Sequence, residues 1–435
     1  MALSTTLNHE IERPISTTFR RAHIRRRQTS DGLYESSWTS ITDKVKKWGQ
    51  FNSQIDDVRL NRFIFSGLTI VCRNDEGDFN PESSPNSLWN GYLTRYRTLV
   101  RIQAGYEQDD RTELPTDTTQ GVFILDDEIK INSIANEATL NCRSLASIFE
   151  EVRANDLGGI YTTQTASDII TRIRDHTDGS GRLVFQQFIS SGAWSIATTT
   201  TNFLLSTSAA VSDKSVWDLM VMLAETEGFI LNFTRSGGIV FKNRDANTTT
   251  SVIDLGGQGV SRPNVIALNW HKEAIDKFYN FIRMKYIDSD TSTSYVTAGT
   301  ITSVDPSNTS WKYGARAYEF ENTFLNNTTA AQSAVNAVFS MTSIMKVELE
   351  IKCLFLPHID VLDRVTLTYL SYNLGDAVLW DTEDWASDAA IDPDDGMNWD
   401  AELGENFNFN GEAFKILSKS TNLDDFTTVL TLREV

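Results

Sequence analysis

The chain has 435 residues, of which 40% are hydrophobic and 10% aromatic, so it is expected to fold into several domains. Its formal net charge of −19 argues against a protein that wraps nucleic acid, which needs a basic surface, although DNA can slide past an acidic wall. The sequence contains no run of 18 apolar residues, so no membrane-spanning helix is predicted. The polar N-terminus is unlike a signal peptide. Cys72, Cys142 and Cys353 are far apart and predict buried thiols in a chain folded in a reducing cytoplasm.

The first predicted unit is a basic N-terminal arm at residues 1–34. His23 lies among five arginines, while the apolar positions around it are too sparse for the core face of a helix. We expect an extended arm or an edge strand. It is either a solvated surface strand or an arm that docks on an acidic neighbour, such as the next subunit.

Residues 35–160 predict a first β domain. A strand at 68–73 is followed by a polar loop and a second strand at 98–104, and no group in this stretch looks reactive. Phe79 and Trp89 are expected to anchor the loop. Two further strands, at 121–125 and 128–134, precede a predicted helix at 144–152.

Residues 161–262 change character and predict a small α/β domain. Ser167 and Asp168 can cap a first helix. The strongest helical pattern in the chain follows, with Ser212 as its expected N-cap and Gly228 as its stop. A β-hairpin over 229–242 comes next.

Residues 263–435 predict a second β domain. The strand at 345–355 alternates apolar with charged residues, an alanine-rich helix over 329–342 precedes it, and a hairpin over 414–433 closes the chain. The segments 97–106 and 362–370 are both short alternating strands beside an arginine, which hints at two related β-domains. The fold class expected is therefore mainly β with an α+β insertion: two β-barrel-like domains that flank a small α/β domain.

An acidic, tryptophan-containing loop is predicted at residues 376–411. The stretch from Val365 to Ala413 holds no lysine or arginine. Asp392, Asp394 and Asp395 form a turn with several carboxylates, the ligand type that Ca²⁺ prefers, although the pattern is not that of an EF-hand. The loop is a solvated acidic segment, a docking loop for a partner, or a cation site.

The sequence predicts no catalytic residue and no cofactor. The five histidines have no metal-binding spacing, and the patterns of nucleophile elbows, dinucleotide-binding loops and phosphate-binding loops do not occur. A pair of acidic residues for glycoside hydrolysis gives no specific signal here, because a chain with 58 acidic residues always contains some possible pair.

Four segments together resemble tail hub or baseplate hub proteins of long-tailed bacteriophages. They are DEGDFNPESSPNSLW with RTLVRIQAGY, SVWDLMVMLAETEGFILNF with GGIVFKNRD, LPHIDVLDRVTLTY, and the terminal FKILSKSTNLDDFTTVLTLREV. Their order matches that of a hub: a β domain, a small α/β insertion and a second β domain. The acidic loop and the basic arm are departures from that pattern.

The resemblance implies a structural virion protein, assembled in the host cytoplasm and placed at the tail tip. Such hubs are homotrimers whose two β domains alternate in a pseudo-sixfold ring around a lumen that passes DNA. The ring joins a sixfold tail tube or distal tail protein, with the tape-measure protein, to a threefold central fibre or spike. Neither sequence-specific binding of nucleic acid nor a membrane span is expected. The interface candidates are Arg97, Thr98, Arg101, Arg364, Arg25, Arg26 and Arg27.

Two other functions compete with the hub. One is a receptor-binding or glycan-acting protein of the tail tip, for which Trp380, Trp385 and Trp399 could line a cleft. The other is a hexameric distal tail or tube ring, which differs from the hub in stoichiometry.

Overall fold

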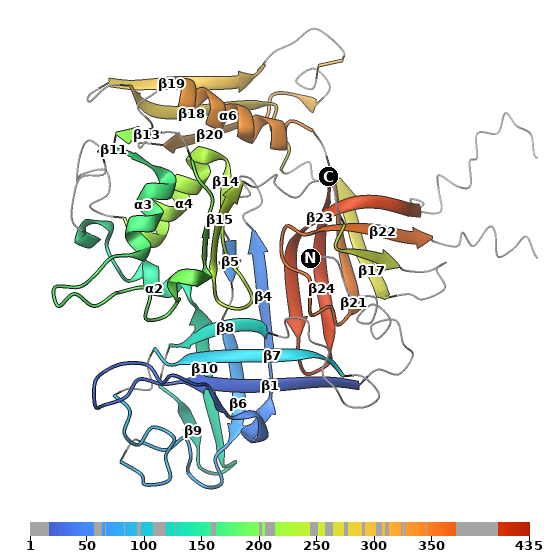
Figure 1. Cartoon of the computed structure of the whole chain (residues 1–435). Helices are drawn as coiled ribbons and strands as arrows, with labels where there is room; N and C mark the ends of the chain where they lie inside the picture. The colour runs from blue at the N-terminus through green and yellow to red at the C-terminus, as the bar shows by residue number, and fades with distance from the viewer. Residues whose placement is uncertain are drawn as a thin grey trace, which may run out of the picture.

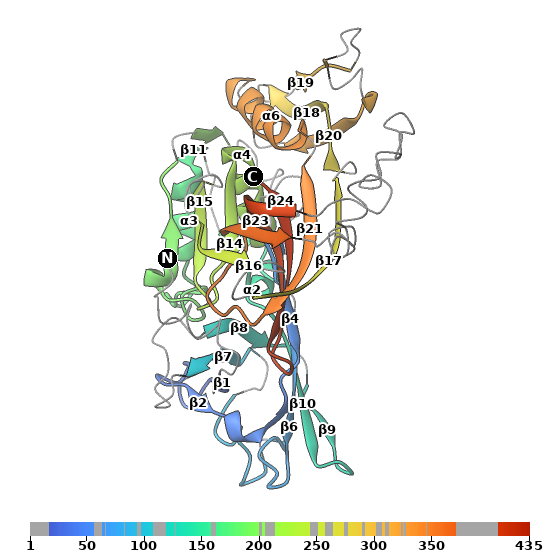
Figure 2. The same cartoon turned by 90° about the vertical axis from the view of Figure 1, so that its right-hand side faces the viewer.

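The fold is known from a computed structural model (Figures 1 and 2). It describes residues 17–55, 63–65, 67–81, 83–93, 97–107, 119–126, 128–157, 162–199, 202–204, 214–243, 251–256, 264–273, 277–288, 292–301, 307–308, 313–322, 325, 328–344, 346–370 and 408–435.

The N-terminal third forms an eight-stranded sheet in the order β2-β1-β7-β8-β10-β6-β3, with β9 beside β10 (Figure 1). Its elements are β1 (Thr17–Arg25), β2 (Thr39–Ser40), η1 (Thr42–Lys44), β3 (Val45–Lys47), β6 (Leu68–Arg73), β7 (Leu99–Glu107), β8 (Thr119–Leu125), β9 (Lys130–Asn132) and β10 (Glu137–Ser144). The strands expected at 68–73 and 98–104 are confirmed as β6 and β7, and Phe79 and Trp89 are fully buried. The arginine-rich segment is strand β1, which lies between β2 and β7.

A small α/β unit follows. Its elements are α2 (Ala146–Glu150), η2 (Ala154–Leu157), β11 (Thr162–Thr165), α3 (Ala166–Arg174), η3 (Ser191–Ala193), β12 (Trp194–Ile196), β13 (Asn202–Leu204), α4 (Val216–Glu227), β14 (Phe229–Phe233) and β15 (Ile239–Asn243). The predicted hairpin is confirmed, because β14 pairs with β15 antiparallel and β12 adds to β15 in parallel.

The N-caps of the two longer helices in this unit differ from those expected. Helix α4 begins after Ser215 rather than Ser212, because Ser215 and Asp218 form a reciprocal capping box. Helix α3 likewise begins after Thr165, which forms the same box with Asp168. Gly228 ends α4 at a φ of 67°, as predicted.

A second eight-stranded sheet has the order β16-β22-β23-β24-β21-β17 and includes β4 and β5. Its strands are β4 (Gln50–Ile55), β5 (Phe63–Phe65), β16 (Ile253–Gly256), β17 (Val265–Glu273), β21 (Val347–Leu354), β22 (Arg364–Leu370), β23 (Asn408–Asn422) and β24 (Thr427–Glu434). Strand β4 comes from the predicted first β domain, yet it pairs with the end of β23. This pairing does not test the domain boundaries expected from the sequence, which stay predictions.

Between β17 and β21 the chain forms a separate α+β unit. Its strands have the order β19-β18-β20, and its elements are β18 (Phe281–Asp288), β19 (Ser292–Gly299), β20 (Ala317–Asn322) and α6 (Thr328–Thr342). Helix α6 covers β18 and β19 and reaches α4 of the α/β unit (Figure 1).

Two hydrophobic cores hold these parts together. One core lies between the two large sheets and includes Ile70 and Leu140 from the first and Ile351 and Leu430 from the second. The other joins the α/β unit to the α+β unit. The predicted class, mainly β with two barrel-like sheets and a small α/β unit, is confirmed.

The two large sheets repeat one arrangement of five strands. The order β7-β8-β10-β6-β3 in the first sheet matches β22-β23-β24-β21-β17 in the second, and every neighbouring pair is antiparallel. The corresponding strands also follow in the same sequence order. The segments 97–106 and 362–370, singled out in the sequence, contribute the corresponding strands β7 and β22.

Candidate functional site

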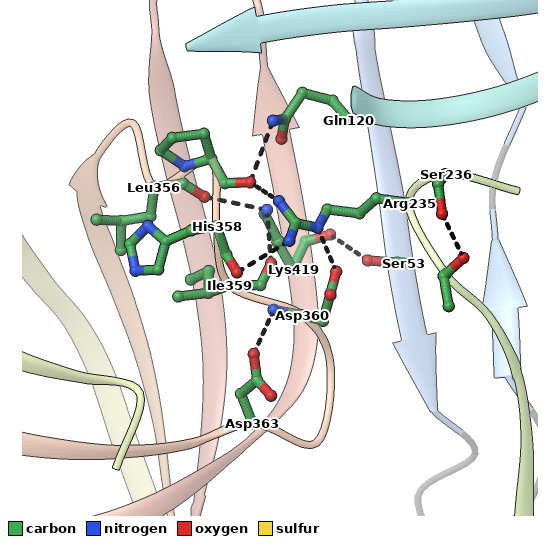
Figure 3. A network of polar contacts seen from close by, with 12 residues as sticks. Ser53, Gln120, Arg235, Ser236, Leu356, His358, Ile359, Asp360, Asp363 and Lys419 are labelled. Atoms are coloured by element: carbon green, nitrogen blue, oxygen red, sulfur yellow. Dashed lines mark hydrogen bonds and ion pairs between the residues drawn. The ribbon is translucent and has the colours of Figure 1, made fainter. Parts of the chain in front are cut away.

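The loop of residues 355–363, between β21 and β22, is held by side chains from three parts of the fold (Figure 3). From the first sheet, the Tyr106 hydroxyl donates to the Phe355 carbonyl at 2.7 Å and the Gln120 amide donates to the Pro357 carbonyl at 3.1 Å. From the turn between β14 and β15, Arg235 donates to the carbonyls of Pro357 and His358. The loop is therefore a joint between the two large sheets and the α/β unit.

Lys419 of β23 holds the same loop from the second sheet. Its ammonium donates to the carbonyls of Leu356 at 3.1 Å and Ile359 at 2.9 Å, and the residue is 4% exposed. Burial lowers the pKa of Lys419 to about 7, and repulsion from Arg235 adds to the effect. The lysine acts here as a donor to backbone carbonyls.

The other ionisable groups of this joint are also perturbed. Burial raises the pKa of Asp363 to about 6 and lowers the pKa of His358 to about 3. Arg235 forms an ion pair with Asp360 at 2.8 Å, and the Asp363 carboxylate accepts a hydrogen bond from the Asp360 amide at 2.7 Å. Perturbed groups cluster at catalytic sites as well as in structural networks, so the space around them decides between the two.

A cavity of about 20 Å³ lies beside Arg235, Asp360 and Lys419. This volume holds about one water molecule and no larger ligand. The hydrogen bonds of Lys419 run to the protein's own backbone rather than into an open cleft. The arrangement can fix three units relative to one another, but it offers no room for a substrate.

Three of the proposed interface arginines gather around one tyrosine of the first sheet. The guanidinium carbons of Arg25 and Arg27 each lie 5.8 Å from the centre of the Tyr34 ring, and the Tyr34 hydroxyl donates to the Arg97 carbonyl. Arg101 stacks at 4.6 Å over Trp38. Arg25 and Arg27 also donate through Nε to the carbonyls of Glu35 at 2.7 Å and Gly32 at 3.1 Å, so each of these two arginines has a backbone partner as well.

The remaining interface candidates lie in other surroundings. Arg26 is 8% exposed and pairs with Glu35, and Thr98 is fully buried. Arg364 lies at the start of β22 in the second sheet. These positions do not test the proposed contacts, which stay predictions.

The calcium candidates Asp392, Asp394 and Asp395 lie outside the described residues, as does most of the acidic loop. Across the described part of the chain, no three His, Cys, Asp or Glu side chains lie close enough to hold a metal ion. The helices described are all too short or too polar to cross a membrane.

No family model and no curated protein matches the sequence. A solved tail protein from Neisseria meningitidis matches 95% of this chain and 96% of its own, with a TM-score of 0.51 and 11% identity. A solved tail protein of prophage MuSo2 from Shewanella oneidensis matches 95% of this chain and 98% of its own, with a TM-score of 0.50 and 10% identity.

The chain has the fold of phage tail proteins. In each comparison the structural similarity covers nearly the whole of this chain and of the solved chain, so it includes the α/β and α+β units as well as the two large sheets. The sequence pointed to this fold through the order of its segments.

The sequence did not point to the joint around Lys419. Strand β23 carries a bulge between Ile416 and Ser418, which breaks the alternation of inward and outward side chains. A strict alternation from Ile416 would place Lys419 on the opposite face from the core. Sequence pattern alone therefore assigns this lysine to solvent.

Proposed function

We propose that the chain is a structural hub at the tip of a phage tail. Three copies would form a ring in which the two large sheets of each chain alternate around the axis. The observation that carries the proposal is the repeated five-strand arrangement within one chain that has a tail-protein fold. Two similar sheets in each of three chains present six similar surfaces to a sixfold partner and three identical ones to a threefold partner.

The proposed partners follow from this symmetry. The sixfold side would meet the tail tube or distal tail protein with the tape-measure protein, and the threefold side would meet a central fibre or spike. The net charge of −19 suits a lumen through which DNA passes without adhering. This function places the chain in the virion, at the tail tip.

The role proposed is structural rather than catalytic. The joint at Lys419 contains strongly perturbed ionisable groups, and the Lys419 ammonium donates to two backbone carbonyls rather than to an open cleft. The joint would keep the two large sheets at a fixed angle, which a ring built from both of them requires.

Native mass spectrometry of the purified chain and electron microscopy of assembled tail tips test the proposal. We expect a trimer in solution, and density with sixfold-like features at the level of the large sheets and threefold symmetry beyond them. A hexamer with true sixfold symmetry would instead favour the distal tail ring. Turnover of a host polysaccharide by the purified chain would favour the glycan-acting alternative.

A further inference from the structure

The hairpin of β9 and β10 ends in an apolar tip that no described part of the chain covers. Ile134 is 99% exposed and Ile131 is 38% exposed. Within the described residues, β9 pairs with β10 alone, and all three of its residues are exposed. Figure 2 shows this hairpin projecting at the end of the molecule opposite the α+β unit.

The second sheet contains the same hairpin at the corresponding place. Asn132 and Asn422 pair with the first residues of β10 and β24, and each side-chain oxygen accepts hydrogen bonds from the backbone N–H groups two and three residues on. Each turn also ends on a residue with positive φ, Asn136 at 48° and Phe426 at 49°. Superposing the two turns residue by residue puts Asp424 at the position of Ile134.

In the second sheet, the tip is covered by the chain's own first sheet. The Asp424 carboxylate accepts from the backbone N–H groups of Trp48 at 3.1 Å and Gly49 at 3.2 Å, directly after β3. The Arg20 guanidinium donates to the Leu423 carbonyl at 2.6 Å, and Leu423 is fully buried. One hairpin tip therefore rests on the β3 edge of the neighbouring sheet.

The strand that corresponds to β3 in the second sheet is β17, and the match extends to individual residues. Val45 pairs with Cys72 and Val265 with Cys353, and in both strands a register shift separates this pair from the next, at Lys47 and at Ala267. By this match, Trp48 and Gly49, which the Asp424 tip contacts, correspond to Leu268 and Asn269. Ile266, two residues before Leu268 on the same strand, is 51% exposed. Strand β17 is the outermost described strand of its sheet.

We infer that the β9–β10 tip of one chain docks on the β17 edge of a second copy of this chain, with Ile134 against the surface around Ile266. The contact would repeat between chains the one that the Asp424 tip makes within the chain. The internal contact is made by the Asp424 carboxylate, whereas Ile134 at the free tip and Ile266 near the corresponding part of β17 are both exposed and apolar. Burying these two isoleucines against each other would favour association.

This inference rests on the proposed ring and specifies how each subunit is oriented toward the next. Each hairpin tip lies on the edge of the next sheet, so the contacts run head to tail and alternate between internal and intermolecular ones. Such a heterologous contact closes into a ring when the rotation matches, here after three chains and six sheets. The proposal thus names the surface through which one subunit recognises the next.

A charge placed at the tip tests the contact. In Ile134→Asp, an unpaired carboxylate would face the apolar surface of the neighbour. We expect the dissociation constant of the trimer, measured by sedimentation, to rise at least tenfold. Ile344→Asp is the matched control, because Ile344 is 61% exposed outside this contact, and it should assemble like the wild type. Both variants should keep the wild-type melting temperature of the dissociated chain, since their side chains face solvent.

Cysteine cross-linking tests the same contact without weakening it. A chain with Ile134→Cys is mixed with a chain carrying Ile266→Cys and oxidised, and we expect a disulfide-linked heterodimer. The three native cysteines are all buried, which limits background. Ile344→Cys mixed with Ile266→Cys is the control and should stay unlinked.

The outcomes separate this inference from the proposed function. A wild-type trimer that Ile134→Asp leaves intact, with no cross-link, overturns the docking contact but leaves the hub in place. A wild-type chain that stays monomeric and does not cross-link contradicts both.

Discussion

Arg26 and Glu35 form an ion pair of 2.7 Å in which the two side chains are only 10% and 12% exposed. Burial pushes the pKa of Glu35 upward, but hydrogen bonds from Arg26 and Tyr92 outweigh this effect and hold the pKa below its usual value. Arg26 also lies 3.9 Å over the Tyr92 ring. The pair lies between β1 and β2, and its contacts with Leu88 and Tyr92 tie this segment to the loop that leads into β7.

Replacing Arg26 by methionine should therefore destabilise the chain strongly. The substitution leaves a buried carboxylate without its cation, which typically costs about 3–5 kcal/mol. Arg283→Met is the matched control, because Arg283 and Glu319 form a pair at 3.5 Å whose side chains are 40% and 62% exposed. Its loss should cost about 1 kcal/mol or less. Chemical denaturation measures both, and equal losses would contradict the importance given to burial.

The stability of the chain should depend on pH through Lys419. Its folded pKa of about 7 lies below its ordinary value of 10.5, so between these values the unfolded chain binds a proton that the folded chain does not. Stability should therefore rise with pH across this window and fall as pH drops toward 7. The full slope is about 1.4 kcal/mol per pH unit.

Lys419→Met removes this titration, so the difference in unfolding free energy between wild type and variant should change between pH 7 and 10. Lys46→Met, at a partly exposed lysine, serves as the control for the loss of a lysine side chain. A difference for Lys419→Met that does not change with pH would mean that the lysine stays charged in the fold.

Gly299 is expected to tolerate no side chain. Its φ is +84°, and an added Cβ would lie 2.1 Å from the Asn280 carbonyl oxygen. Gly91 has nearly the same φ, +86°, but nothing within 4 Å of the added atom. Gly91→Ala should cost about 1–2 kcal/mol from backbone strain. Gly299→Ala should cost about 1–3 kcal/mol more from overpacking, and similar melting temperatures for the two variants would argue against the close approach.

The N-cap of α4 can be assigned by substitution. Ser215→Ala removes the side chain that accepts from the Asp218 amide at 3.0 Å, and loss of such a cap costs about 1 kcal/mol. Ser212→Ala tests the cap expected from the sequence and should change stability little. A larger loss at Ser212 than at Ser215, measured by thermal unfolding, would restore the sequence-based assignment.

Much of the secondary structure could be predicted because its signals are local. The alternation of Leu349, Ile351 and Cys353 with charged residues specified β21, and Gly228 specified the end of α4. The turn between β23 and β24 was equally visible. In each case, a few neighbouring residues carry the periodicity or the backbone requirement.

The arrangement of these elements could not be predicted in the same way. The pairing of β4 with β23 joins residues more than 360 positions apart, and no local pattern specifies it. The bulge before Lys419 reverses the expected orientation of that side chain, which hides the joint. The matching hairpins share Asn132 and Asn422, yet their tips, Ile134 and Asp424, have opposite chemistry, so the repeat is weak in sequence.

The pairing of β4 with β23 also has a consequence for synthesis. Strand β4 leaves the ribosome more than 360 residues before the part of β23 with which it pairs. The second large sheet can therefore acquire β4 only after β23 has been made, and contacts of such long range form slowly. A chain whose synthesis stops before β23 lacks this partner of β4 and cannot complete the second large sheet.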